Sequence, residues 1–262
     1  MTARRRTTTL PTSTSSPYLR LPPGTALLLL ALFLPTLLPG CVTTRSHDMI
    51  MCDSIGPQIT TPSHAAPADE LDVLVLSAGG PWGAFGVGFL DGWSGITTPQ
   101  ERRRPVFEIA IGISTGAMMV THAFLGNEYD QILREQVATL TTKDVFRRQS
   151  VFATMLGDAA TDSTPLRRRL EQIITEETLD LVADAWLNEG RRLAVIAVDL
   201  DCGSTETLDL TAVALRRSDP MRRERYIDYI MASAASTVVF HPVFIDGHMM
   251  VDGALRQHVP FP

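Results

Sequence analysis

Three short apolar segments stand out in the hydrophobic pattern of the chain. They are LDVLVLS at 71–77, VFEIAIG at 106–112 and RRLAVIAVDLD at 191–201, each rich in Val, Ile or Leu. Uninterrupted apolar runs of this length are typical of strands buried on both faces of a parallel sheet. The pattern therefore predicts three buried strands.

Segments with apolar residues at helical spacing follow these strands. AFGVGFLDGW (84–93) comes after the first strand, and GAMMVTHAFLG (116–126) comes directly after the second. Further helices are predicted within 128–140, 163–190 and 219–236. Because strands alternate with helices, the sequence predicts an α/β fold, a single domain with a central, largely parallel sheet flanked by helices.

Two later segments predict additional strands beside the third one. TETLDL (205–210) follows the third strand closely enough to pair with it. HPVFIDGHMMVDG (241–253) has the pattern of a hairpin that turns at Asp246-Gly247.

The N-terminal 41 residues have the pattern of a targeting segment. Basic residues precede an apolar run at 25–38, which is too short to span a hydrocarbon core of ~30 Å but has the length of a signal-peptide core. The run ends in LPGC, which resembles a bacterial lipobox, in which Cys41 becomes the lipidated first residue of the mature protein. We expect export to the bacterial cell envelope and lipid anchoring to a membrane. The alternative is a plain secretory signal that is cleaved nearby.

The remaining sequence divides into a tether and a domain. Residues 42–70 are polar and contain three prolines, which is typical of a linker, and 71–262 form the domain.

Once Cys41 is lipidated, Cys52 and Cys202 remain and could pair in an oxidising compartment. Cysteine, histidine and carboxylate residues show no metal-ligand spacing, so no metal is implied. The net charge of −6, without a long block of like charge, argues against nucleic acid as a partner.

GISTG, at 112–116, is the strongest candidate for chemistry. Ser114 stands between Gly112 and Gly116, where the second strand meets the following helix. This strand–turn–helix context is that of a nucleophile elbow, in which glycines allow close backbone approach and the serine projects from the turn. The alternative is a small residue in an ordinary tight turn.

A serine nucleophile needs groups that stabilise the oxyanion formed during acyl transfer. The loop SAGGPWG follows the first strand, and its Gly79 and Gly80 can offer backbone N–H groups, whereas Pro81 has none. The N–H of Thr115 is a further candidate. The loop lacks the glycine spacing of nucleotide-binding loops, which argues against a phosphate site.

The base is less evident from the residues alone. Asp252, followed by Gly253, comes just after a predicted strand and could reach a serine at the end of a neighbouring strand. Taken alone, the residue is better interpreted as a solvated turn aspartate.

The glycine loop, G-x-S-x-G and D-G-A occur in this order, and together they resemble the patatin-like phospholipase family over residues 71–260. The segment MASAASTVVFHPVFIDG is also similar to the stretch that precedes the family's D-G motif. The resemblance implies a Ser-Asp dyad without histidine that hydrolyses acyl esters of phospholipids or other lipids without a cofactor. Carried over, Ser114 is the nucleophile and Asp252 the base, and the oxyanion loop contains Gly79, Gly80 and Gly83.

Two features depart from the family pattern. Trp82 stands where the family often has Arg or Lys, which removes a charge near the oxyanion loop and leaves headgroup preference open. The chain also ends ten residues after Asp252, whereas family members usually continue, and this predicts a domain that is short at its C-terminus.

Two other functions remain open at this point. The first is an esterase with a Ser-His-Asp triad, in which Ser114 would act with Asp199 or Asp201 and with His258. His241 and His248 lie beside the predicted hairpin, where a histidine more often has a structural role. The second is a non-catalytic envelope lipoprotein that uses the fold as a binding module.

Overall fold

The computed structural model describes Cys52 and residues 71–97, 103–145, 147–148, 161–237 and 239–259. All of them belong to one compact unit, Thr43–Pro262. The expected signal peptide, Cys41 and all of the tether except Cys52 lie outside the described residues. Within the described ranges, no helix is long and apolar enough to cross a membrane.

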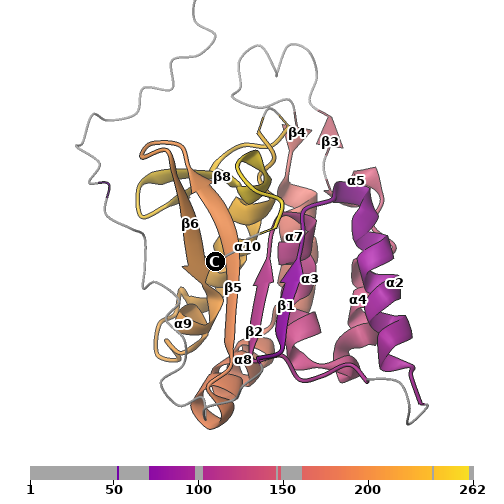
Figure 1. The fold of residues 1–262 in the computed structure, drawn as a ribbon. Helices are drawn as coiled ribbons and strands as arrows, with labels where there is room; N and C mark the ends of the chain where they lie inside the picture. The colour runs from indigo at the N-terminus through magenta and orange to yellow at the C-terminus, as the bar shows by residue number, and fades with distance from the viewer. Residues whose placement is uncertain are drawn as a thin grey trace, which may run out of the picture. The chain divides into compact units, whose positions relative to one another are not determined.

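Six strands form one mixed sheet in the order β1-β2-β5-β8-β7, with β6 paired to the remaining edge of β5 (Figure 1). The strands are β1 (Val73–Leu76), β2 (Ile109–Gly112), β5 (Arg192–Asp199), β6 (Ser204–Asp209), β7 (Val243–Ile245) and β8 (His248–Asp252). The first three are parallel, and the last three pair antiparallel. The predicted α/β fold with mostly parallel core strands is therefore confirmed.

Helices flank this sheet, and a small two-stranded sheet lies apart from it. The helices are α2 (Gly83–Ser94), α3 (Thr115–Leu125), α4 (Asp130–Gln136), α5 (Thr142–Val145), α7 (Thr164–Ile173), α8 (Glu176–Glu189), α9 (Leu210–Ala214) and α10 (Arg222–Ala234). The short 3-10 turns are η2 (Gly80–Trp82), η3 (Asn127–Tyr129) and η4 (Gly253–Leu255), and β3 (Arg147–Arg148) pairs with β4 (Thr161–Asp162). Helices α3 and α10 pack on the sheet and on each other, and α2 lies against α3 and α4 beside β1 (Figure 1).

The long helical segment expected within 163–190 is two helices, because the chain turns at Ile174 and Thr175. Ile174 has extended backbone dihedral angles, and Thr175 caps the start of α8. The Thr175 hydroxyl accepts the Thr178 N–H at 3.2 Å, and the Thr178 hydroxyl accepts the Thr175 N–H at 3.3 Å. This reciprocal capping box is a stronger local signal than the apolar periodicity that runs through both helices.

The sheet is arranged around β5, which is the longest of its strands and almost wholly buried. Its Ala194 pairs with Ile111 of β2 on one edge and with Asp209 of β6 on the other. Further along, Ala197 pairs with Glu206 of β6 and with Asp252 of β8. Strands β2 and β8 therefore occupy the same edge of β5 and meet end to end.

A disulfide joins Cys52 to Cys202, with Cα atoms 5.4 Å apart. Cys202 lies in the turn between β5 and β6, at the carboxyl end of β5. The sequence alone left this pairing open, since two cysteines separated by 150 positions carry no local signal of their proximity.

Candidate active site

Ser114 occupies a strained turn between β2 and α3. Its backbone has φ 56° and ψ −119°, a region that residues with a side chain rarely adopt. The turn is fixed by the Ile113 N–H, which donates to the Leu76 carbonyl of β1, and by the Gly116 N–H, which donates to the Ile113 carbonyl. The predicted strand–turn–helix context of Ser114 is therefore present.

The two glycines beside Ser114 are required by the closeness of strand and helix. A Cβ atom on Gly112 would lie 2.6 Å from the Gly116 carbonyl oxygen. A Cβ atom on Gly116 would lie 2.1 Å from the carbonyl oxygen of Leu76. Neither position can hold a larger residue without backbone movement, which gives the G-x-S-x-G pattern a steric cause.

Asp252 reaches Ser114 because β8 meets β2 along the edge of β5. The Ser114 hydroxyl donates a hydrogen bond of 2.7 Å to Asp252 Oδ2. The other carboxylate oxygen, Oδ1, accepts the Ala254 N–H at 2.9 Å. Gly253 allows this approach, since a Cβ atom there would lie 2.5 Å from the Ile196 carbonyl oxygen. The structure thus brings together the two side chains that the sequence singled out.

The carboxyl group of Asp252 is more basic than an ordinary aspartate. Burial raises its pKa, and hydrogen bonds from Ala254 and Ser114 oppose this shift, as does the nearby charge of His258. A buried carboxylate that accepts a hydrogen bond from a serine hydroxyl is suited to take up a proton.

Ser233 is a contact of the site that the sequence reasoning did not single out. It lies on α10, is fully buried, and its hydroxyl accepts the Ser114 N–H at 3.2 Å while donating to the Ile196 carbonyl at 2.6 Å. Two residues further, at the C-cap of α10, the Ala235 carbonyl accepts the Asp252 N–H at 3.0 Å. The end of α10 therefore holds the backbone of both Ser114 and Asp252. The only sequence signal was the run of small residues MASAAS.

The glycine loop after β1 lies against the start of α3. The Gly80 carbonyl accepts the Thr115 hydroxyl at 3.0 Å, and a Cβ atom on Gly83 would lie 2.2 Å from Thr115 Cγ2. Gly80 has φ 53°, which favours glycine. The backbone N–H groups of Gly79, Gly80 and Thr115 donate no hydrogen bond to any other described residue.

The histidines are arranged differently from a Ser-His-Asp triad. His248 Nδ1 lies 2.6 Å from Asp199 Oδ2, and both side chains are buried. Asp199 also accepts the N–H groups of Asp201 and Cys202 through Oδ1. His258 is exposed, and the described partner of the Ser114 hydroxyl is Asp252.

One group of described residues has the composition of a metal site. Ligand atoms of Asp199, Cys202 and His248 lie within 4.8 Å of one another. The sulfur of Cys202 is bonded to Cys52, so it is not a thiolate, and Nδ1 of His248 is engaged with Asp199. These atoms are used within the fold in this structure.

Comparison with known proteins agrees with the motifs. The sequence model of the patatin-like phospholipase family matches residues 74–262, a range that includes both Ser114 and Asp252. VipD from Legionella pneumophila has a similar structure, with a TM-score of 0.45 and 14% sequence identity over 74% of this chain. The match spans 48% of VipD, about half of its length. Among curated proteins, none matches this sequence. Because the family match covers most of the chain, this protein belongs to the patatin-like phospholipase family.

Proposed function

We propose that this protein hydrolyses carboxylic ester bonds of phospholipids or other acyl lipids, with Ser114 as nucleophile and Asp252 as general base. The observation that carries the proposal is the hydrogen bond of 2.7 Å from the Ser114 hydroxyl to Asp252 Oδ2. It joins a projecting serine to a buried carboxylate of raised pKa, with no imidazole between them.

In the first half of the reaction, the Ser114 Oγ attacks the ester carbonyl carbon while Asp252 takes its proton. The tetrahedral intermediate collapses, the bond to the leaving oxygen breaks, and Asp252 returns the proton to the departing alkoxide. A fatty acyl group is then bound to Ser114 Oγ. In the second half, Asp252 accepts a proton from water, whose oxygen attacks the acyl carbon. The bond between the acyl carbon and Ser114 Oγ then breaks, Asp252 returns the proton to Ser114 Oγ, and the fatty acid leaves.

The negative charge of the intermediate requires preorganised donors. The N–H groups of Gly79, Gly80 and Thr115 are suited to this role, since they donate no hydrogen bond to any other described residue. The start of α3 adds the partial positive charge of a helix N-terminus at the same place. We assign these three N–H groups to the oxyanion hole, with Gly83 allowing the loop to pack on Thr115.

We further propose that the mature protein is exported and attached to a membrane of the bacterial cell envelope through a lipidated Cys41. Support comes from the sequence, in which a short apolar run ends at LPGC. An anchored enzyme would act on lipids of the membrane to which it is attached.

Ser114→Ala should abolish ester hydrolysis, and Asp252→Asn should lower kcat by at least ~10³-fold, because both side chains act as one catalytic unit. His241→Ala, His248→Ala and His258→Ala should each stay within about tenfold, a barrier change of ~1.4 kcal/mol. The measurement is kcat on a short-chain acyl ester, with each variant first checked for a native-like melting transition.

An inactive, folded histidine variant beside an active Asp252→Asn variant would contradict this assignment and favour the triad. An active Ser114→Ala variant would remove the nucleophile assignment altogether. Labelling by a fluorophosphonate separates an enzyme from a binding module, since only an activated serine reacts.

Activity should be lost on the acid side of neutrality through protonation of Asp252. The base works only as a carboxylate, and burial raises its pKa above 3.8, the ordinary value for aspartate. As pH falls, activity therefore disappears at a higher pH than an exposed aspartate would give.

Since the His258 charge lowers the pKa of Asp252, His258→Gln should move the acid limb of kcat/KM to higher pH. An acid limb that vanishes in a histidine variant would point to a histidine base instead.

Ser233→Ala should reduce kcat by roughly tenfold or more while KM changes little. The substitution leaves the buried Ser114 N–H and Ile196 carbonyl without their partner, and a misplaced nucleophile reacts slowly even when substrate binds normally. Ser236→Ala, three residues along, is the matched control. The rate of fluorophosphonate labelling should fall in parallel with kcat. Equal labelling rates in Ser233→Ala and the control would show that Ser233 only stabilises the fold.

Cys41→Ala should release the protein from the membrane fraction of a bacterial host or leave the precursor unprocessed. Without the cysteine thiol, no lipid can be attached at this position. Fractionation and the mass of the mature N-terminus measure both effects. Normal processing with continued membrane attachment would contradict lipidation at Cys41.

A further inference from the structure

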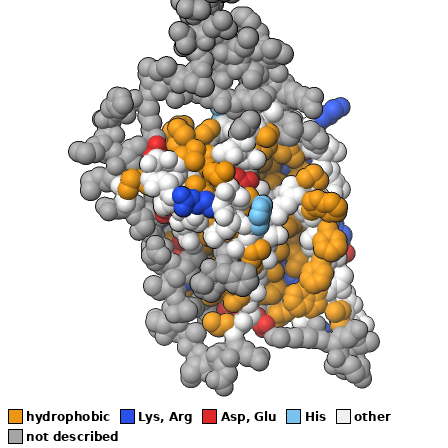
Figure 2. Space-filling model, turned by 45° about the horizontal axis from the view of Figure 1, so that its top comes forward, with side chains coloured by type: hydrophobic (Ala, Val, Ile, Leu, Met, Phe, Trp, Pro, Cys, Tyr) orange, Lys and Arg blue, Asp and Glu red, His pale blue; other side chains and the backbone are white. Residues whose placement is uncertain are grey.

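An exposed aromatic surface begins beside the glycine loop. Trp82, Phe85 and Phe89 lie on one side of the first turns of α2, with 78%, 74% and 59% of their surfaces exposed. Figure 2 shows hydrophobic side chains gathered along the side of the domain where α2 lies. Singly exposed apolar residues are ordinary, whereas contiguous aromatic ones mark an interaction surface.

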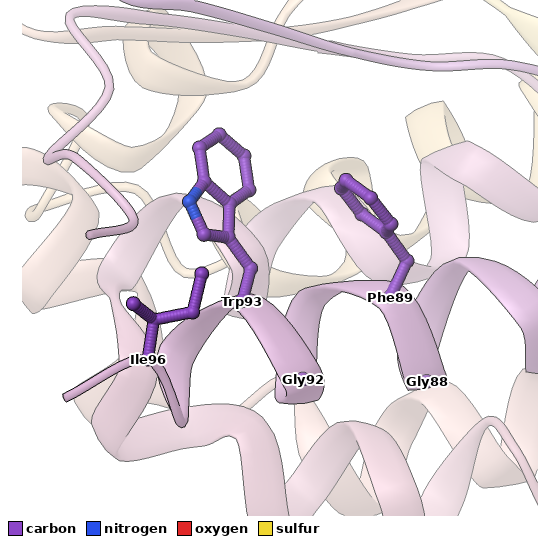
Figure 3. A pocket seen from close by; sticks show the side chains of 5 residues that line it. All are labelled: Gly88, Phe89, Gly92, Trp93 and Ile96. Carbon is purple, nitrogen blue, oxygen red and sulfur yellow. The ribbon is translucent and has the colours of Figure 1, made fainter. Parts of the chain in front are cut away.

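The surface is shaped as well as apolar. Gly88 and Gly92 leave an open depression on α2 whose walls are Phe89, Trp93 and Ile96 (Figure 3). A Cβ atom on either glycine would meet no other atom within 4 Å, so none of the described residues fills this space. Phe89 and Trp93 stand next to each other, with ring centroids 5.7 Å apart.

Charge is nearly absent from this helix. Asp91 is the one ionisable side chain in α2, and it forms an ion pair with Arg134 of α4. A partner of this surface is therefore recognised through burial of apolar area rather than through electrostatic attraction.

The surface starts at the edge of the sheet that carries Ser114. Strands β1, β2 and β5 are parallel, so their carboxyl ends share one edge. The glycine loop follows β1, Ser114 follows β2, and the turn that contains Cys202 follows β5. Trp82 belongs to the glycine loop, two residues after Gly80.

The disulfide holds Cys52 at this same edge. Leu71 precedes β1 and therefore lies at the amino ends of the parallel strands, which is the opposite edge of the sheet. The bond between Cys52 and Cys202 instead leaves ten residues between Cys41 and a point beside the carboxyl end of β5.

A random-coil segment of ten residues spans about 18 Å on average. A compact domain of this size is about 40 Å across. An anchor at Cys41 therefore keeps the edge that carries Ser114 near the lipid and disfavours the reverse orientation.

We propose that Trp82, Phe85 and Phe89 form the surface through which the domain binds the lipid bilayer that holds its substrate. The inference rests on the proposed lipid acyl hydrolase activity. Aromatic side chains settle at the boundary between lipid headgroups and acyl chains, which would present the ester region of the lipid to Ser114.

The test uses the compact unit Thr43–Pro262, which contains the disulfide and lacks the anchor, with Phe85→Ser/Phe89→Ser as the variant. Trp82 is left in place because it is part of the glycine loop. Leu187→Ser is the matched control, since Leu187 is 60% exposed on α8, before the amino end of β5. Binding to neutral phosphatidylcholine vesicles is measured by cosedimentation in a Ser114→Ala background, and hydrolysis is measured on vesicles and on a monomeric short-chain ester.

We expect the double variant to bind vesicles at least ~30-fold more weakly and to lose vesicle hydrolysis to a similar extent. Hydrolysis of the monomeric ester should stay within ~3-fold, and the control should match the parent. Addition of 0.5 M NaCl, which shortens the Debye length to about 4 Å, should leave vesicle binding unchanged. Vesicle binding without hydrolysis of either substrate would overturn the proposed activity and leave the surface assignment intact. Undiminished vesicle binding by the double variant would overturn the surface. The parent could also fail to bind vesicles but form dimers that are lost in the double variant. That result would overturn the lipid-binding proposal in favour of self-association.

Discussion

The edge of β5 that β2 and β8 share is the constraint on which the site depends. Pairing with β2 ends at Val195, and pairing with β8 begins at Ala197, so a single residue of β5 separates the two strands on this edge. That residue is Ile196, whose carbonyl accepts the Ser233 hydroxyl. The Ser114 turn and the Asp252 turn therefore meet at Ile196, and any shift of β8 along β5 would separate the two side chains.

The position of Ser114 has a conformational cost that its surroundings offset. A non-glycine residue at φ 56° costs about 1–3 kcal/mol and persists only where neighbouring contacts determine it. Here the turn is held by β1 through Leu76, by α10 through Ser233, and by the glycines that let strand and helix touch. The same contacts keep the hydroxyl projecting toward Asp252, so the strain and the geometry of the site have one cause.

The sequence predicted those parts of the fold that local patterns determine. The three apolar runs became β1, β2 and β5, and Asp246-Gly247, both with positive φ, form the expected hairpin turn between β7 and β8. Ser114 and the glycine loop were identifiable because steric demands on glycine leave a mark in the sequence. One apolar periodicity runs through Ile174 and Thr175, and it gave no sign that α7 ends and α8 begins there.

The contacts that escaped prediction join residues far apart in the chain. Ser233 is 119 positions from Ser114, and Asp199 is 49 positions from His248. A serine among alanines at the end of a helix has no local feature that distinguishes a support of the active site from a small residue in a packed interface. Asp252 was ambiguous for the same reason until its order after the glycine loop and G-x-S-x-G was considered.

The end-to-end meeting of β2 and β8 also favours the proposed dyad over a triad. Adjacent turns on one sheet edge bring a serine oxygen and a carboxylate oxygen to 2.7 Å, which leaves no space for an imidazole between them. An aspartate that replaces histidine as base must be less acidic than usual, and burial at the end of β8 raises its pKa in that direction. The N–H of Ala254 limits this rise, since it stabilises the ionised form. The balance leaves a carboxylate that accepts a proton more readily than one in water, as the proposed reaction requires.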